Sequence, residues 1–364
     1  MRVVYPPPRS RKVFAAAHVA AVASAGGGAV IDWESTLRFR EHLWAHGFGV
    51  AEAMDTAQRG MGLSWEQARE LIARTAARAA ETGRLGALAC GAGTDQLAGA
   101  SGHPLRAIID AYAEQVAFVQ STGAQVILMA SRALAASAGG PRDYLEVYGE
   151  LLKQAERPVI LHWLGEAFDP ALRGYWGGGF DAAAATVLEL IDRAGGQVDG
   201  VKLSVLDEGR EVALRRRLPA GVRLYTGDDL NYAALIRGDA DGSHSDALLG
   251  AFAAITAPAA AALAALDRGD VAGYDAAMDP TVPLSRLIFE PPTYHYKAGV
   301  AFLAWLNGLQ PQFVMLGGLE RQRPAGHLIR LFELAAAARA LTEPELAAMR
   351  MGEMLARSAH SGPV

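Results

Sequence analysis

The chain has little cysteine, little lysine and no long apolar run. Its 364 residues include one cysteine, Cys90, which excludes an intramolecular disulfide and a cysteine-ligated metal site. Such cysteine usage is typical of a reducing compartment, so we expect a cytoplasmic protein. No apolar stretch reaches the roughly 18–20 residues that cross a bilayer, which argues against a membrane protein. The net charge of −5 and the pI of about 6.0 argue against nucleic acid as a partner.

The position of one lysine is the first indication of chemistry. Only four of the 34 basic residues are lysine, and Lys202 lies in VDGVKLSVLD, residues 198–207, an apolar and β-branched run that a strand would bury. Burying an ammonium is costly unless its pKa falls and the group becomes a neutral amine. A neutral lysine amine is a nucleophile toward carbonyl groups. The sequence therefore predicts a reactive lysine on a buried strand.

Short apolar runs alternate with longer amphipathic stretches along the first 250 residues. Eight strands that alternate with helices favour an α/β fold, a (β/α)8 TIM barrel with parallel strands. A doubly wound open sheet is the alternative, but Gly26-Gly27-Gly28 lacks the spacing of a phosphate-binding turn. The basic and then Ala-rich N-terminus resembles a signal peptide, and we interpret it instead as the first strand. The predicted strands are 13–21, 47–54, 85–91, 124–130, 158–164, 198–204, 222–227 and 240–245, and the clearest helices are 64–81 (with a capping box of Ser64 and Gln67), 105–120, 142–154 and 181–193.

The pattern changes after the eighth predicted strand. From Leu248 to about Ser358 the chain is helical, with breaks at Pro280, at Pro291-Pro292 and around Pro324. A barrel needs one helix after its last strand, so about three helices are left over. We predict a barrel over residues 1–250 and C-terminal helices over 251–364 that pack on the barrel or on another subunit, without forming an independent domain.

Polar residues at the ends of the predicted strands are the candidates for a site, because barrel enzymes place their chemistry there. Lys202 and His162 stand out because both interrupt strongly apolar strands. Asp228 and Asp229 are more simply explained as caps of a helix that starts near Leu230. The remaining strand-end candidates are His18, Glu52, Asp55, Thr56, Thr94, Ser131, Arg132, Thr226, Ser243, His244 and Ser245.

Several segments, read in order, resemble one superfamily. They are GAGTDQ, VILMAS, RPVILHWLG, VDGVKLS, RLYTGDDLNYAALIRGDADGSHS and PLSRLIFEPPTYHYKAG. Over residues 12–340 the chain resembles the dihydrodipicolinate synthase / N-acetylneuraminate lyase superfamily, most of all a divergent branch once described only as a domain of unknown function. The resemblance implies that Lys202 occupies the place of the lysine that forms a Schiff base with a 2-keto acid. It also implies hydroxyl groups near the substrate carboxylate, here Thr56 and Thr94, no cofactor, and a homo-oligomer.

The departures from the family pattern concern the substrate. Family members usually carry a tyrosine at the end of the fifth strand, where this chain has His162, which can still act as a general acid or base. A second tyrosine, after the fourth strand, is replaced here by Ser131-Arg132, which suggests an anionic substrate group. The loop 165–181 is long and glycine-rich, carries Arg173, and is predicted to be a lid. His244 on the eighth predicted strand is also unusual.

Three hypotheses follow for the function. The first is a Schiff-base lyase without metal or cofactor, which cleaves or dehydrates a keto acid or oxidised sugar with Lys202 as nucleophile and His162 as proton carrier. Its predicted substrate-binding residues are Asp55, Thr56, Thr94, Ser131, Arg132, Arg173 and His244.

The second hypothesis is a metal-dependent lyase or isomerase on the same barrel, with ligands from His18, Glu52, Asp55, His162 and His244. The third is a non-catalytic barrel that binds a metabolite. In all three the partner is a small molecule, and we expect a homodimer or homotetramer.

Overall fold

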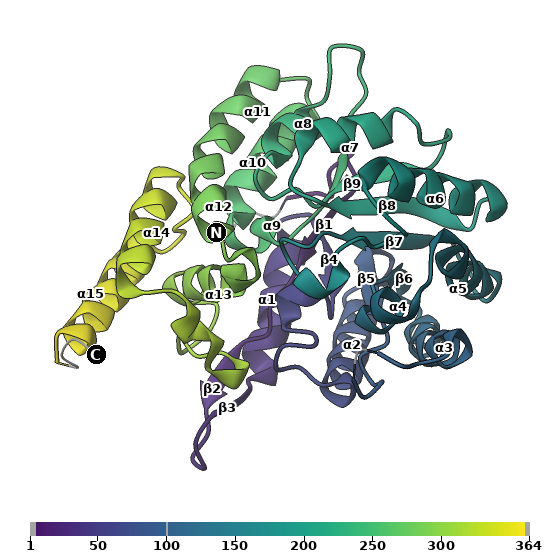
Figure 1. The fold of residues 1–364 in the computed structure, drawn as a ribbon. Helices are drawn as coiled ribbons and strands as arrows, with labels where there is room; N and C mark the ends of the chain where they lie inside the picture. Colours follow the sequence, from purple (N-terminus) through teal and green to yellow (C-terminus); the bar gives the residue numbers. More distant parts are fainter. Residues whose placement is uncertain (1–4, 100, 361–364) are drawn as a thin grey trace.

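The computed structural model describes residues 5–99 and 101–360, with side chains as far as residue 356. Eight parallel strands close into a barrel, in which β10 pairs with β1 and each other strand pairs with its neighbours along the chain (Figure 1). The predicted TIM barrel is therefore confirmed. The barrel strands are β1 (Val13–Ala16), β4 (Gly49–Glu52), β5 (Leu88–Ala92), β6 (Gln125–Leu128), β7 (Val159–Leu164), β8 (Val198–Ser204), β9 (Arg223–Thr226) and β10 (Asp246–Leu249).

Helices between the strands surround the barrel. The four clearest predicted helices are confirmed to within one residue at each end. The capping box is also present, because the Ser64 hydroxyl accepts from the Gln67 amide while the Gln67 side chain accepts from the Ser64 amide. The helices of the barrel are α1 (Trp33–Ala45), α2 (Trp65–Glu81), α3 (Leu105–Ser121), α4 (Arg132–Ser137), α5 (Pro141–Lys153), α6 (Phe180–Arg193), α7 (Glu208–Arg215) and α8 (Tyr232–Arg237).

The first and last predicted strands are corrected. The run 13–21 contains only the short β1, and the chain then forms a hairpin of β2 (Ala21–Ala23) and β3 (Ala29–Ile31), which projects at the lower edge of Figure 1. A uniform alanine run gives no indication of where a barrel strand ends. The strand predicted at 240–245 is a turn, because Gly, Ser and Asp favour turns, and the strand is the apolar segment that follows it.

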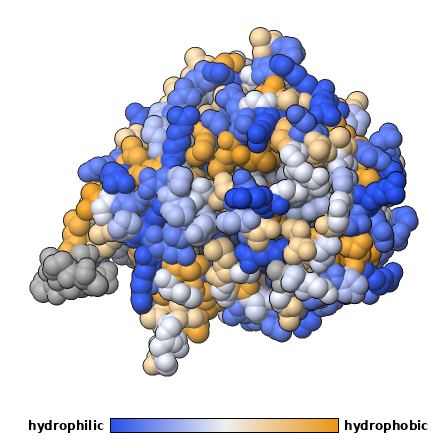
Figure 2. Space-filling model, in the orientation of Figure 1, coloured by the Kyte–Doolittle hydropathy of each residue, from blue (hydrophilic) through white to orange (hydrophobic). Residues whose placement is uncertain are grey.

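The barrel interior is filled by its own inward-facing side chains, so it is a packed core and not a channel. They form a separate buried cluster of Phe14, Ala16, Ala51, Met54, Ala89, Ile127, Met129, Ile160, Tyr225 and Leu248. A larger buried cluster lies between the strands and the helices. On the outer face, hydrophilic residues alternate with small hydrophobic areas (Figure 2).

The C-terminal helices form a substantial layer beside the barrel, more divided than the three extra helices that were predicted. The expected breaks are present: Pro280 lies in a 3-10 turn, Pro291-Pro292 precedes α13, and Pro324 precedes α14. Every residue of α13 is buried, while α14 and α15 lie at the left margin of Figure 1. The helices are α9 (Ala251–Ala254), α10 (Thr256–Leu266), α11 (Val271–Met278), α12 (Val282–Ile288), α13 (Tyr296–Leu306), α14 (Ala325–Ala337) and α15 (Pro344–His360). Within residues 5–99 and 101–360, no helix is both long enough and apolar enough to cross a membrane.

A buried ion pair fixes the carboxyl end of β4, next to the candidate site. The Glu52 carboxylate accepts from Nε and Nη2 of Arg40, both at 2.8 Å, from the Thr75 hydroxyl at 2.7 Å and from the Ala53 amide at 2.8 Å. Both charged side chains are fully buried. The pair connects α1, α2 and β4, so Glu52 has a structural role here.

We expect Arg40→Met to lower the free energy of unfolding by about 3–5 kcal/mol, because it leaves the Glu52 carboxylate buried and unpaired. The matched control on the same helix is Arg38→Met, whose exposed pair with Glu34 contributes about 0.5 kcal/mol or less. Urea unfolding followed by circular dichroism compares the two. Equal midpoints for both variants would contradict this role of the ion pair.

Candidate active site

The site is built around two neighbouring strands that carry Lys202 and His162. The two residues are direct partners in the parallel register of β7 and β8. Lys202 is 7% exposed, and its amine has no hydrogen-bond or ion-pair partner among the described residues. Burial lowers the pKa of Lys202, and the negative charges of Asp55 and Asp229 partly oppose this. The structure thus holds a lysine whose neutral, nucleophilic form is favoured by its surroundings.

His162 is a neutral imidazole beside that amine. It is fully buried, and burial lowers its pKa well below the ordinary value, with a smaller contribution from the charge of Lys202. Nε2 lies 3.5 Å from the hydroxyl of Ser204, the last residue of β8, and Nδ1 has no partner in the described chain. A neutral imidazole is both a donor and an acceptor, so it can take up a proton and return it.

The two aspartates after β9, which the sequence analysis treated alike, have different hydrogen-bond partners. Asp228 stabilises the turn before α8, since its Oδ1 accepts from the amides of Leu230 and Asn231, whereas the N-cap of α8 is Asn231 and has no side-chain cap bond. Asp229 instead accepts from the Ala251 amide at 2.8 Å. Burial raises the pKa of Asp229 to about 7, while the Ala251 amide and the positive charge of Lys202 act in the opposite direction. The predicted helix cap is therefore corrected to a turn that Asp228 holds before α8, and Asp229 is a carboxyl group on which the charge of Lys202 acts.

A cavity of about 370 Å³ lies at the carboxyl ends of β4, β5, β6 and β7. This volume suits a small metabolite. Lys202 and His162 are not among its lining residues, and Asp55 is the lining residue whose charge acts on Lys202. Six charged side chains line the cavity, together with the hydroxyls of Thr94 and Ser131 and several apolar groups; the charged ones are Asp55, Arg59, Asp95, Arg132, Asp169 and Lys297.

The hydroxyls of Thr94 and Ser131 meet in the cavity wall. Their oxygens are 2.6 Å apart. The Ser131 amide donates to the hydroxyl of Tyr175 at 3.0 Å, and that hydroxyl is 2.8 Å from the hydroxyl of Tyr148. Tyr175 comes from the long loop after β7, so this loop contributes a buried anchor for the cavity wall.

The same loop also packs over the C-terminal helices. The ring of Phe168 meets Phe289 and Tyr296 edge to face, with centroids 6.3 and 6.0 Å apart. Asp169 accepts from Arg132 at 2.6 Å, which connects the loop to α4. The loop thus packs against the cavity in this structure, and its action as a lid remains a prediction.

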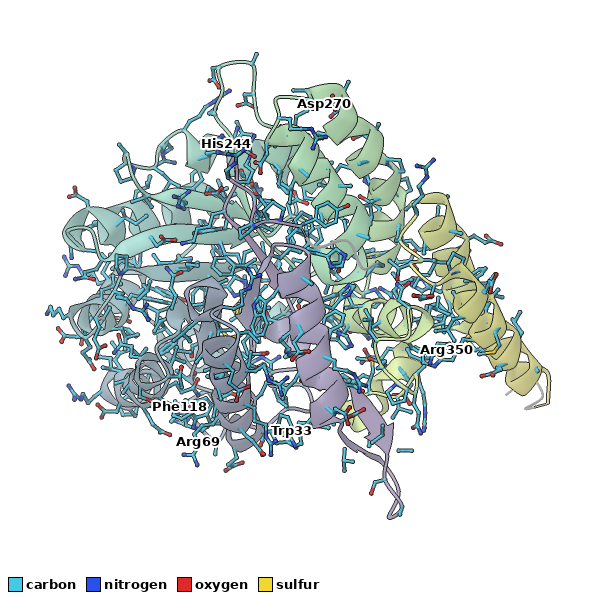
Figure 3. All side chains as sticks on the ribbon, turned by 180° about the vertical axis from the view of Figure 1, so that it is seen from behind. Trp33, Arg69, Phe118, His244, Asp270 and Arg350 are labelled. Carbon is cyan, nitrogen blue, oxygen red and sulfur yellow. The ribbon has the colours of Figure 1, made fainter. Side chains whose placement is uncertain are left out.

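Several predicted site residues lie elsewhere. Arg173 does not line the cavity and forms an exposed pair with Glu166 at 2.7 Å. His244 precedes β10 and therefore lies at the amino end of the barrel, on the opposite side of the molecule from Trp33, where α1 begins (Figure 3). The prediction failed because the eighth strand was placed six residues too early. Thr56 does not line the cavity either, and its hydroxyl is 2.9 Å from that of Tyr296.

The residues proposed as metal ligands do not converge. Within the described chain, no three His, Cys, Asp or Glu side chains are grouped as a metal site requires. His18 has its Nε2 at 2.7 Å from the side-chain oxygen of Gln310, and Glu52 is bound to Arg40.

Sequence reasoning missed Lys297, at the start of α13. It lines the cavity, is 1% exposed, and has its pKa lowered to about 8 by burial, although the charges of Asp55 and Asp169 oppose this. The scarcity of lysine, which drew attention to Lys202, applies equally to this residue, but Lys297 follows Thr293-Tyr294-His295-Tyr296 and not an apolar run. The other residues that line the cavity come from distant parts of the chain, between residues 55 and 172, so the sequence around Lys297 does not reveal its place in the cavity.

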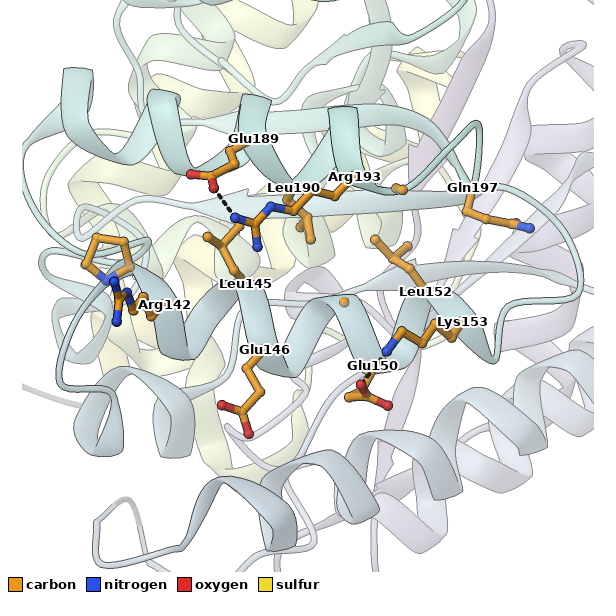
Figure 4. Close-up of a pocket in the computed structure, with 13 residues that line it drawn as sticks. Arg142, Leu145, Glu146, Glu150, Leu152, Lys153, Glu189, Leu190, Arg193 and Gln197 are labelled. Atoms are coloured by element: carbon orange, nitrogen blue, oxygen red, sulfur yellow. Dashed lines mark hydrogen bonds and ion pairs between the residues drawn. The ribbon is translucent and has the colours of Figure 1, made fainter.

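A larger cavity of about 840 Å³ lies on the outside of the barrel between α5 and α6 (Figure 4). Four of its six charged lining residues form ion pairs, Lys153 with Glu150 and Arg193 with Glu189. It has no lining residue from a barrel strand, so we place the site at the strand ends.

The molecule is a closed barrel with a buried lysine on its sixth strand and a cavity at the carboxyl ends of neighbouring strands, and comparisons with known proteins give its family. The chain belongs to the family described as "Protein of unknown function (DUF993)", whose model matches residues 1–359. No curated protein matches the sequence.

Solved structures of dihydrodipicolinate synthases share the fold. The enzyme from Oceanobacillus iheyensis is 14% identical with a TM-score of 0.65, covering 89% of this chain and 96% of that one. The one from Thermotoga maritima is also 14% identical, with a TM-score of 0.66 and coverage of 92% and 100%. The one from Bacillus clausii is 13% identical, with a TM-score of 0.67 and coverage of 91% and 99%. The predicted family, described only as a domain of unknown function, and the predicted fold are confirmed.

The four lysines allow a direct measurement of the amine at the centre of the site. After reductive methylation with ¹³C-formaldehyde, we expect the methyl resonances of Lys202 to titrate below its ordinary pKa of 10.5, because burial disfavours the ammonium. Exposed Lys153 serves as the internal reference, and Lys→Arg variants assign the signals. Titration of Lys202 together with Lys153 would show that burial does not favour the neutral amine.

Proposed function

We propose that the protein is a Schiff-base lyase that acts on a keto acid or an oxidised sugar. The single observation that carries this proposal is Lys202: a buried amine without a partner among the described residues, on the sixth barrel strand and beside a neutral imidazole. The shared fold with dihydrodipicolinate synthases supports it.

The proposed reaction begins with attack of the neutral Lys202 amine on the ketone carbon. Loss of water from the resulting carbinolamine gives an iminium ion, which acts as an electron sink. In a retro-aldol reaction, a base removes the proton of the β-hydroxyl, the carbon–carbon bond breaks, and its electrons move into the iminium to give an enamine and a free aldehyde. Protonation of the enamine carbon and hydrolysis of the imine then release the second product and the amine.

His162 is the proposed proton carrier of these steps. Its neutral ring can accept the hydroxyl proton and return it to the enamine carbon. Asp229, with a pKa of about 7, can take the proton that Lys202 must lose before it attacks. The same residues serve a dehydration, in which the α-proton and the β-hydroxyl leave, and both reactions belong to the proposal.

The cavity wall supplies the proposed binding groups. Thr94 and Ser131 offer hydroxyls at the ends of β5 and β6, and Arg132 offers a guanidinium for an acidic group. Asp55 lies where its charge acts on the attacking lysine. We also propose that the enzyme is a cytoplasmic homo-oligomer with small-molecule partners and no required cofactor.

Reductive trapping tests the nucleophile. With pyruvate or a keto-sugar and borohydride, we expect a stable adduct on Lys202, because reduction converts the imine to a secondary amine. Peptide mapping by mass spectrometry locates the adduct, and its mass identifies the carbonyl compound. Lys202→Ala should give none at this position, with Lys153→Ala as the matched control; absence of adduct across a broad panel would contradict the mechanism.

The proton carrier is tested by separating imine formation from turnover. We expect His162→Gln to form the borohydride-trapped adduct on Lys202 but to lose roughly 10²–10⁴-fold in turnover of whichever substrate the panel identifies, the range for loss of a general acid–base group. Pre-steady-state trapping and kcat are measured on the same preparation. Unchanged kcat would assign proton transfer to another residue.

A further inference from the structure

One charged group in the cavity has no function in the scheme above. Lys297 is 1% exposed and lines the cavity. Its ammonium lies 3.3 Å from the carbonyl oxygen of Tyr294 and 4.4 Å from the centre of the Tyr296 ring. An ammonium has three donors, and Tyr294 provides its only hydrogen-bond acceptor within the described chain. No carboxylate of that part of the chain is within ion-pair distance of it.

The two arginines of the cavity each form an ion pair. Arg59 binds Asp95 through two hydrogen bonds of 2.7 and 2.9 Å, and Arg132 binds Asp169 at 2.6 Å. Lys297 therefore differs from both arginines: it is a buried cation that lines the cavity without an ion pair. A buried charge with open donors is costly unless an acceptor arrives.

Asp55 relates this cation to the reacting amine. Asp55 lines the same cavity as Lys297, and its charge acts on both Lys202 and Lys297. Asp55 lies outside ion-pair distance of Lys297, so its carboxylate leaves the donors of that ammonium open to a ligand.

We propose that Lys297 binds an acidic group of the substrate, a carboxylate or a phosphate, at the end remote from the carbonyl that Lys202 attacks. The substrate class is then an acidic ketone that carries this remote anionic group. The identity of the reacting carbonyl rests on the proposed function, whereas the anion site stands on the cavity geometry alone.

Isothermal titration calorimetry tests the site with four probes: pyruvate, 2-ketoglutarate, dihydroxyacetone phosphate and the neutral hydroxyacetone. Pyruvate lacks the remote acid, and the next two distinguish a carboxylate from a phosphate. We expect one of these two to bind more tightly than pyruvate. Lys297→Met should weaken that probe by roughly 10- to 100-fold, the range for a charge-assisted hydrogen bond, and leave hydroxyacetone unaffected.

The controls keep the outcomes separate. Lys153→Met removes an exposed ammonium that pairs with Glu150, and it should bind like the wild type. Lys297→Gln keeps a donor but loses the charge, and it replaces the Met variant if circular dichroism shows that one to be unfolded. Three results would each overturn the inference. They are equal affinities of the wild type and both Lys297 variants, an adduct on Lys297 itself, and no binding of any acidic probe.

Lys202→Ala distinguishes the two proposals, because it prevents the imine but leaves the cavity cation in place. Lys297-dependent binding that persists in Lys202→Ala, with no adduct in the wild type, would remove the lyase proposal and leave the anion site. An adduct on Lys202 that is unaffected by Lys297→Met would support the lyase proposal and remove the anion site.

Discussion

The desolvation of one ammonium group is the constraint on which the site depends. Lys202 lies in the wall of a closed barrel, where water cannot solvate its charge. The parallel register with β7 then places His162 directly beside it, and the same burial keeps that ring neutral. Two nitrogen bases that lie side by side and buried, each with its pKa lowered by burial, are unusual for a purely structural core and suited to chemistry on a carbonyl.

Other buried charges in the molecule behave differently, and the contrast helps to separate structure from function. Glu52 has four hydrogen-bond donors around its carboxylate, including Nε and Nη2 of Arg40. Arg59 is similarly occupied by Asp95. Lys202 and Lys297 lack such partners in the described chain, although they lie in the same end of the barrel. We interpret the paired charges as structural groups that hold the loops in place. We interpret the two lysines as groups that bind a ligand.

The sequence was sufficient to predict the fold. It was also sufficient to predict those site residues whose positions depend on a single strand. Alternation of apolar and amphipathic segments predicted the barrel, and the interruption of apolar strands by Lys202 and His162 predicted that each lies at the end of a barrel strand. His244 was misplaced because a turn rich in Gly and Ser was taken for the strand that follows it. Lys297 was missed because its place in the cavity depends on how α13 packs on the barrel. Such tertiary placement is not encoded in local periodicity, and the same holds for Tyr175, whose hydroxyl meets Ser131 across 44 residues.

The most direct test of the central claim is a crystal structure of the protein reduced with borohydride in the presence of 2-ketoglutarate. The account predicts continuous electron density from the Lys202 amine to the former ketone carbon, with His162 in contact and the remote carboxylate at Lys297. Density for an unmodified Lys202, with the ligand bound elsewhere or to another residue, would contradict it.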